Sequence, residues 1–103
     1  MSSSYFEDQD FENINYYEQP LEAGEYEQCR FEGCSFAQAN LSNFQFTDCS
    51  FSNCDFSMAT LQQTAMRNIQ LKHCKLVGVH FEACNPFLFE VHFEHCNLQL
   101  ASF

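Results

Sequence analysis

A chain of 103 residues is long enough for one domain with a core of modest size. It contains 13 Phe and 7 Cys but no Trp, only 3 Gly and only 2 Pro, so many rings must be buried at regular positions and few turns can depend on glycine or proline. The formal net charge of −10 disfavours nucleic acids and anionic membranes as partners and favours a basic protein.

The acidic residues are concentrated near the N-terminus. Residues 1–32 contain nine of them and a single base, Arg30, whereas residues 33–103 contain five acidic and three basic residues. Two interpretations are open: a solvated acidic leader that promotes solubility, or a surface that binds a basic partner. For the second, the candidate contact residues are Glu18, Glu22, Glu25, Glu27 and Glu32.

The cysteines and the first residues indicate the cellular compartment. The chain starts Met1-Ser2-Ser3-Ser4, without the basic and apolar regions of a signal peptide, and no apolar run reaches the length of a membrane span. Seven is an odd number of cysteines, and none of them form a Cys-x-x-Cys pair. We therefore expect reduced thiols in the cytoplasm and no membrane partner.

From about Cys29 to Phe81 a large apolar residue occupies every fifth position, and most residues two positions earlier are small. Five residues turn an α-helix by about 500°, so these positions would drift around it, and in a flat strand they would alternate between faces. The pattern fits a backbone that bends once per unit, with the central residue and the one two before it pointing inward. Four such sides close a square coil of about twenty residues, and coils stack at the ~4.8 Å spacing of paired strands.

This arrangement predicts the core residue by residue. The central positions are Phe31, Phe36, Leu41, Phe46, Phe51, Phe56, Leu61, Met66, Leu71, Leu76 and Phe81. The inward cysteines are Cys29, Cys34, Cys49, Cys54, Cys74, Cys84 and Cys96.

The repeat unit resembles a known family. The segments Cys49–Asn53, Cys54–Met58 and Ala39–Asn43 are similar to the A/C-D/N-L/F-x-x unit of pentapeptide-repeat proteins. Members of that family fold as right-handed quadrilateral β-helices. The resemblance therefore implies an all-β solenoid of about four to five coils, with residues 24–103 as its repeat domain.

The register slips once. The central position after Phe81 is Pro86, and proline is poorly tolerated inside a sheet. The pattern resumes two residues late, with the central residues Phe93, Leu98 and Phe103. This predicts a bulge at residues 84–90 whose apolar residues Phe87, Leu88 and Phe89 cannot all be buried. Either two of them fill the corner around the insertion, or they form an exposed apolar contact patch.

Both ends of the chain depart from the repeat. Residues 1–23 keep the spacing of five but lose the small residues two positions earlier, so we interpret them as an acidic cap or a degenerate coil. The last residue, Phe103, stands at a central position. We expect either that another chain covers this edge or, as we favour, that these residues are the N-terminal part of a longer solenoid.

No pattern in the sequence indicates catalysis, a cofactor or a metal. Outward positions are polar and lie on flat walls, whereas inward positions are Phe, Leu, Cys and Ala, so no reactive groups are expected to converge. Every His falls on an outward position while the cysteines point inward, and the cysteine spacing does not supply four convergent zinc ligands. The ~4.8 Å between coils exceeds the ~3.8 Å between the Cβ atoms of a disulfide, so the thiols are expected to be free.

Within the family, the stretch from Cys74 to Leu98, with its slip near Pro86, is most similar to the quinolone-resistance (Qnr-type) branch. Those bacterial proteins resemble B-form DNA in width and charge, and they bind type II topoisomerases in place of DNA. The resemblance implies a DNA mimic that binds DNA gyrase or topoisomerase IV and protects it from quinolones, with a homodimer contact through the C-terminal end. The alternative is a structural or protein-interaction scaffold with no topoisomerase role.

Overall fold

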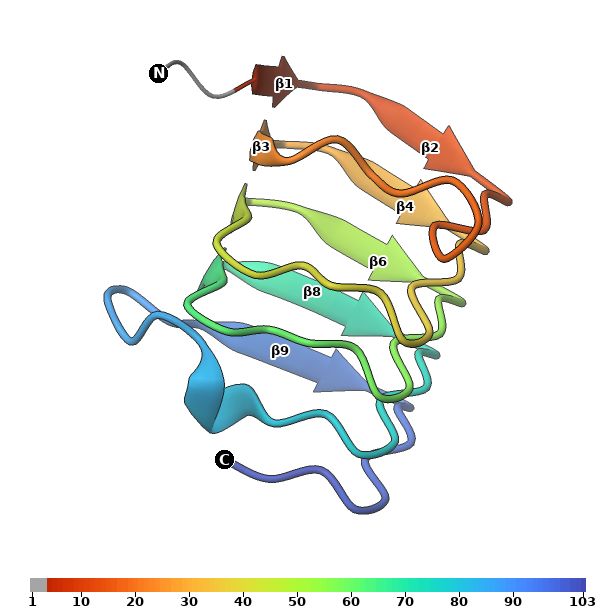
Figure 1. Cartoon of the computed structure of the whole chain (residues 1–103), viewed down its shortest axis with the longest axis vertical. Coiled ribbons are helices and arrows are strands. Elements are labelled where there is room, and N and C mark those ends of the chain that lie inside the picture. The colour runs from red at the N-terminus through yellow and green to blue at the C-terminus, as the bar shows by residue number, and fades with distance from the viewer. Residues whose placement is uncertain (1–3) are drawn as a thin grey trace.

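The computed structural model describes residues 4–103, so the expectation for residues 1–23 can be compared with it only from Ser4 onward. The chain winds as a right-handed β-solenoid of about five coils, with the N-terminus at one end of the stack and the C-terminus at the other (Figure 1). Its principal extents are 36 × 29 × 22 Å. The sequence prediction of an all-β quadrilateral solenoid is therefore confirmed. Within the described residues no helix is long and apolar enough to cross a membrane.

Each coil has four walls, which we name A to D in chain order, with about five residues per wall. Wall A carries one parallel sheet, formed by β1 (Ser4–Glu7), β3 (Gly24–Glu27), β5 (Gln45–Thr47) and β7 (Ala65–Arg67). Wall B carries a second, formed by β2 (Asp10–Glu12), β4 (Arg30–Glu32), β6 (Ser50–Ser52), β8 (Ile69–Lys72) and β9 (Val91–Glu94). Walls C and D are linked between coils by single bridges, such as Ser35 to Asp55 and Asn40 to Thr60. The short 3₁₀ turn η1 (Phe81–Ala83) lies on wall D.

Adjacent coils pair with an offset of 20 residues until the last one. Phe31, for example, lies opposite Phe11 on one side and Phe51 on the other. Between β8 and β9 the offset becomes 22, because Leu71 pairs with Phe93. Asn85 still pairs with Ala65 at an offset of 20, so the two extra residues are accommodated on wall A of the last coil, between Asn85 and β9. In Figure 1 the loop that contains them projects from the side of the solenoid.

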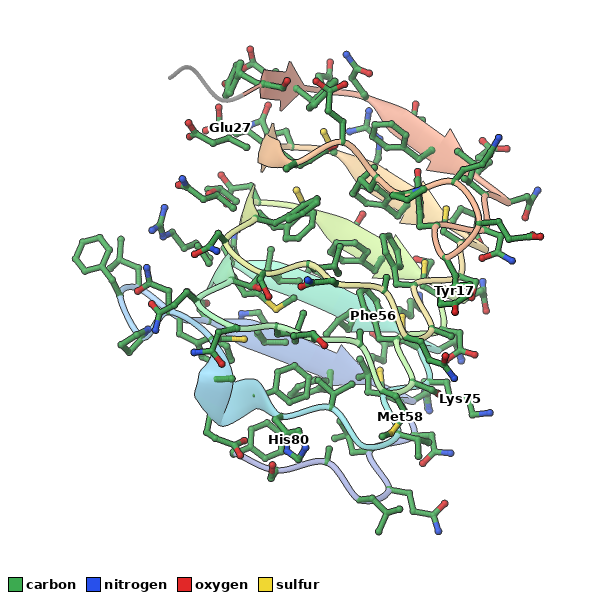
Figure 2. All side chains as sticks on the ribbon, in the orientation of Figure 1. Tyr17, Glu27, Phe56, Met58, Lys75 and His80 are labelled. Atoms are coloured by element: carbon green, nitrogen blue, oxygen red, sulfur yellow. The ribbon has the colours of Figure 1, made fainter. Side chains whose placement is uncertain are left out.

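The interior is a set of aromatic columns that run along the solenoid axis. Phe31 stacks on Phe51 with ring centroids 4.7 Å apart, and Phe36 stacks on Phe56 at the same distance. Figure 2 shows Phe56 inside the coil, whereas Glu27 lies on the outer side of wall A. All eleven predicted central residues from Phe31 to Phe81 are buried, as are six of the seven cysteines. Phe93, Leu98 and Cys96, which were also expected in the core, are only half-buried, because the last coil is covered on one side only.

The bend between walls comes from the last residue of each unit. At nearly every corner this residue has a positive φ between 52° and 72°, for example Asn53 at 54° and Gly33 at 65°. Such left-handed backbone is easiest for Gly and is tolerated best by Asn and Asp among other residues. This requirement explains why corner positions of the repeat so often carry Asn, Asp or Gly.

Walls C and D differ from A and B because their polar side chains form local turns. The side-chain carbonyl or carboxylate oxygens of Asn15, Asn40, Asp55 and Asn97 each accept a hydrogen bond from the backbone N–H two residues later, at 2.8–3.0 Å. These turns compete with extended pairing, since the side chain satisfies a backbone donor locally. Where Asn or Asp precedes the central residue on walls C and D, its side chain therefore stabilises the turn.

From Ser4 onward the N-terminal segment is an outer coil. β1 and β2 pair in parallel with β3 and β4. The aromatic columns also continue into it, since Phe6 stacks on Tyr26 at 4.6 Å and Tyr16 on Phe36 at 4.8 Å.

Candidate interaction surface

Negative charge is unevenly distributed around the solenoid. Walls A and B carry ten of the 14 acidic residues, and seven of these ten belong to the first two coils. Walls C and D carry only four, Glu18, Glu22, Asp55 and Glu82. The strand walls near the N-terminal end therefore form the acidic surface of the molecule.

The first two coils bring like charges into register. Glu7 lies directly opposite Glu27 on wall A, and Glu12 lies directly opposite Glu32 on wall B. Like charges at the ~4.8 Å spacing of paired strands destabilise the pairing by a few tenths of a kcal/mol to ~1 kcal/mol. Glu7, Glu12 and Glu32 are exposed, and Glu27 is half-buried. A local arrangement that disfavours folding points to a functional surface.

Basic residues compensate only part of this charge. Arg30 forms ion pairs with Asp8, at 2.9 Å, and with Asp10, which lie on the coil above. Among the described residues, no basic side chain forms an ion pair with either stacked glutamate pair. Their polar partners are neutral: Tyr5 donates its hydroxyl to Glu27, and Asn53 donates to Glu32 at 2.9 Å. The hydrogen bond to the Glu27 carboxylate raises the pKa of Tyr5 to about 12.

The structure separates the five glutamates expected to contact a partner. Glu25, Glu27 and Glu32 lie on the strand walls, whereas Glu18 and Glu22 lie on walls C and D of the first coil. The sequence interpretation missed Glu7 and Glu12 as members of the same surface. A step of 20 residues from Glu27 and Glu32 would have found them, because the offset holds from the first coil onward.

The charge density of the first two coils can be compared with that of DNA. A duplex carries one negative charge per ~1.7 Å of axis, which is about three per ~4.8 Å coil. Residues 4–43, the first two coils, contain nine acidic residues and one basic residue, so the two coils together exceed that density, with six acidic residues and no basic residue on the first coil and three against one on the second. Residues 44–103 contain five acidic and three basic residues over three coils and fall well below it. A DNA-like density is therefore confined to the N-terminal end.

The loop at residues 86–89 is the second prominent surface feature. Phe87 and Leu88 are each 64% exposed, whereas Phe89 is half-buried and packs edge-on against Phe81, with ring centroids 6.5 Å apart. The expectation that two of the three apolar residues fill the corner is therefore wrong, because Phe89 alone turns inward. Asn85 accepts a hydrogen bond from the backbone N–H of Phe87 at 2.9 Å, which gives the loop a turn where other coils have a strand. The outcome is an exposed apolar tip.

The loop borders a shallow groove on wall A. The groove has a volume of about 460 Å³ and lies between the loop and the third and fourth coils. Arg67 forms one side of it and lies over the Phe87 ring, and Asp48 accepts a hydrogen bond from Asn68 at 2.7 Å on the same wall.

The cysteines and histidines face opposite ways, as their positions in the repeat indicate. All seven cysteines are free, and the thiol of Cys49 donates to the carbonyl of Tyr26 at 3.2 Å. Burial raises the pKa of both Cys49 and Cys84 to about 12. His73 and His95 are exposed and stack with ring centroids 5.1 Å apart. Within residues 4–103 no cluster of three or more His, Cys, Asp or Glu side chains is placed to hold a metal ion.

Two solved structures of one protein, QnrB1, have the same fold as this chain. Full-length QnrB1, a plasmid-mediated fluoroquinolone resistance protein, matches with a TM-score of 0.66 and 18% identity over 90% of this chain and 43% of its own. A trypsin-treated variant of QnrB1 matches with a TM-score of 0.66 and 21% identity over 97% of this chain and 51% of its own. The chain thus spans about half the length of these proteins. A search of curated proteins finds no matching sequence.

The sequence itself carries the family signature over most of its length. The family model for a pentapeptide repeat region matches residues 19–103, which include four of the five coils. The repeat of five, the inward Phe and Leu residues and the square coil all agree with that match. The chain belongs to the pentapeptide-repeat family.

Proposed function

We propose that this protein acts without catalysis, as an acidic rod that occupies a basic, DNA-binding surface of a type II topoisomerase such as DNA gyrase or topoisomerase IV. In doing so it would protect the enzyme from quinolones. The observation that carries the proposal is the two stacked glutamate pairs, Glu7 with Glu27 and Glu12 with Glu32, on walls whose charge density reaches that of a duplex. The shared fold with QnrB1 supports the choice of partner.

The electrostatics of the acidic walls explain how such binding would be driven. In the free protein the stacked carboxylates repel each other across the ladder. Lysine or arginine side chains of a partner would relieve that repulsion and would also accelerate encounter by electrostatic steering. Binding should therefore weaken steeply as salt is added, since exposed charges are screened beyond ~10 Å at 0.1 M ionic strength.

The apolar loop tip would supply a second, less salt-sensitive contact. Phe87 and Leu88 project from wall A, the same side of the solenoid that carries Glu7 and Glu27. Exposed aromatic residues of this kind are typical anchors of protein interfaces. An acidic surface for orientation and an apolar tip for affinity would together fit a folded protein partner better than free DNA or a membrane.

A supercoiling assay tests the proposal. Purified protein is added to DNA gyrase with and without a fluoroquinolone, and the expected result is inhibition of supercoiling by the protein alone or protection of the enzyme from the drug. The double variant Glu12→Gln, Glu32→Gln should weaken the effect about tenfold or more. The matched control Asp55→Asn, Glu82→Gln removes the same charge from walls C and D and should behave as the native protein. If the native protein neither inhibits supercoiling nor protects the enzyme from the drug, the proposal is contradicted.

A second candidate is a protein-interaction scaffold with no topoisomerase role. It is favoured by the nearly neutral walls of the last three coils, which do not continue the duplex-like charge of the first two. A pull-down with topoisomerase subunits separates the two candidates, because a scaffold of this kind would not retain them at any salt concentration.

The predicted homodimer would use the C-terminal end, where the rings of Phe81 and Phe103 stack 5.1 Å apart and Phe103 is 70% exposed. Light scattering at several protein concentrations tests this contact. Phe103→Ser should shift the equilibrium to the monomer if the aromatic end forms the interface.

A further inference from the structure

The N-terminal end of the solenoid contains a cavity that the acidic walls do not explain. Its volume is about 290 Å³, and it is lined mainly by aromatic and aliphatic side chains of the first coil. Two polar residues, Gln19 and Glu22, complete its lining. The cavity lies over the end of the aromatic columns rather than on a wall.

Two of the rings that line this cavity present a face to it. Phe6 stacks on Tyr26 with an interplanar angle of 15°, Phe11 on Phe31 with 12°, and Tyr16 on Phe36 with 23°. Phe6 and Phe11 are half-buried, so each is covered on one face by the second coil and leaves its other face toward the end of the solenoid, whereas Tyr16 is buried on both faces. Aromatic faces carry negative potential and attract cations placed within about 6 Å of the ring centroid.

The charge of the first coil adds to this attraction. Residues 4–23 contain six acidic residues and no basic residue. One of the six, Glu22, lines the cavity and accepts a hydrogen bond from the hydroxyl of Ser4. The nearest basic side chain along the chain, that of Arg30, belongs to the second coil and pairs with Asp8 and Asp10.

We propose that this end cavity binds a single guanidinium or ammonium group, presented as an arginine or lysine side chain by a basic segment of a partner protein. Two aromatic faces, those of Phe6 and Phe11, and the Glu22 carboxylate suit a cation with an aliphatic stem, since the stem packs on the rings while the charge meets the carboxylate. A second copy of this chain is a poor occupant, because its own N-terminal coil is acidic. The inference deepens the proposed function, on whose basic partner it rests, but it does not depend on that partner being a topoisomerase.

The test measures binding of a small probe to the whole chain by NMR. The probes are the Nα-acetylated amides of arginine and citrulline, called arginine amide and citrulline amide below, so that only the guanidinium of the first carries charge. Arginine amide is titrated while the ring signals of Phe6, Phe11 and Tyr16 are followed, with citrulline amide as the uncharged probe of nearly the same shape. We expect saturable shifts with arginine amide and at least tenfold weaker binding of citrulline amide. Equal binding of the two probes, or shifts outside the first coil only, would overturn the proposal.

Two variants localise the site. Glu22→Gln removes the carboxylate at an exposed position and should weaken arginine amide binding several-fold without lowering the melting temperature. Phe11→Leu removes one aromatic face and should weaken it further; if this variant does not fold, Glu22→Gln alone decides the outcome. The control Glu94→Gln, on the last coil, should bind as the native protein does. A protein that binds arginine amide but does not affect gyrase would retain this site while contradicting the proposed function, so the two failures are distinguishable.

Discussion

The guanidinium carbon of Arg67 lies 5.6 Å from the centroid of the Phe87 ring, although the two residues are 20 positions apart in the chain. The Arg67 Nε also lies 3.5 Å from the carbonyl oxygen of Phe87. A fourth-coil strand thus supports the tip of the loop that the two-residue insertion creates. The loop is held against wall A by a cation over a ring, not by burial of its apolar tip.

Replacing Arg67 should loosen this loop while leaving the solenoid intact. A cation over an aromatic ring at an exposed site contributes ~0.5–1 kcal/mol, so Arg67→Gln should lower the free energy of unfolding by no more than about that amount. Amide hydrogen exchange at residues 87–90 should accelerate several-fold. Lys72→Gln, which removes an exposed 3.8 Å ion pair with Glu94, serves as the control and should leave exchange in the loop unchanged. Equal exchange in all three proteins would show that the ring contact does not hold the loop.

Substitution at a central position should unfold the protein, whereas the same substitution at its neighbour should not. Phe51 is fully buried in the column between Phe31 and Leu71, with Phe56 edge-on beside it, so Phe51→Asp places an unpaired carboxylate in an apolar interior. Ser52 lies on the outer face in the column between Glu32 and Lys72, where a new carboxylate meets one charge of each sign. Circular dichroism should show loss of the β signal for Phe51→Asp, and a change in melting temperature of no more than a few degrees for Ser52→Asp. Similar behaviour of the two variants would contradict the inward assignment.

Gly24 is required for the first coil to pack on the second. A Cβ atom built at this buried position would lie 2.3 Å from the carbonyl oxygen of Ser4. Because this oxygen belongs to the backbone, it cannot shift without a cost in free energy. Gly24→Ala should therefore cost ~1–3 kcal/mol, the usual range for overpacking. The loss should appear first as faster proteolysis and hydrogen exchange in residues 4–23. Unchanged protection there would mean that β1 adapts without cost.

The stacked glutamates should cost stability that neutral variants recover. Glu12→Gln removes the repulsion with Glu32, so its unfolding free energy should rise by ~0.2–1 kcal/mol at low salt. The gain should shrink as salt is added, because the repulsion is screened. Chemical denaturation at 10 mM and 500 mM sodium chloride measures both effects. Asp55→Asn is a suitable control, since its side chain can still accept the hydrogen bond from the Ser57 N–H at 2.8 Å.

The buried thiols should make stability fall at alkaline pH. Burial raises the pKa of Cys49 and Cys84 to about 12, so both stay protonated in the folded protein at pH values where the unfolded chain ionises its thiols. Their contribution is fully present below the ordinary thiol pKa, near 9, and is lost as the pH rises toward 12. The slope approaches ~1.4 kcal/mol per pH unit for each thiol. Denaturant melts between pH 8 and pH 11 measure this slope.

Thiol reactivity provides an independent readout of the same burial. A thiol reagent at pH 8 should modify Cys96, which is half-buried, well before the six buried cysteines. Rapid modification of all seven in the folded protein would contradict the core assignment.

The sequence alone was sufficient for the solenoid and its core. A period of five with Phe or Leu at each centre is incompatible with a helix or a flat strand, so the inward positions from Phe31 to Phe81 followed without the structure. The insertion near Pro86 could also be located, because the pattern resumes two residues late and the pairing of Leu71 with Phe93 has that offset. These features depend on residues close in sequence, and periodicity reports them directly.

The tertiary structure decided where the regular offset begins and ends. A step of 20 residues already relates Glu7 to Glu27 and Glu12 to Glu32, but only the pairing of β1 with β3 and of β2 with β4 established that the degenerate first coil keeps this offset. The sequence also did not determine which of the three apolar loop residues point inward, since inserted residues have no repeat position that sets the direction of their side chains. Phe89 turns inward and Phe87 outward because Asn85 closes a turn and Arg67 holds the outer ring, two contacts that arise only once the coils are stacked.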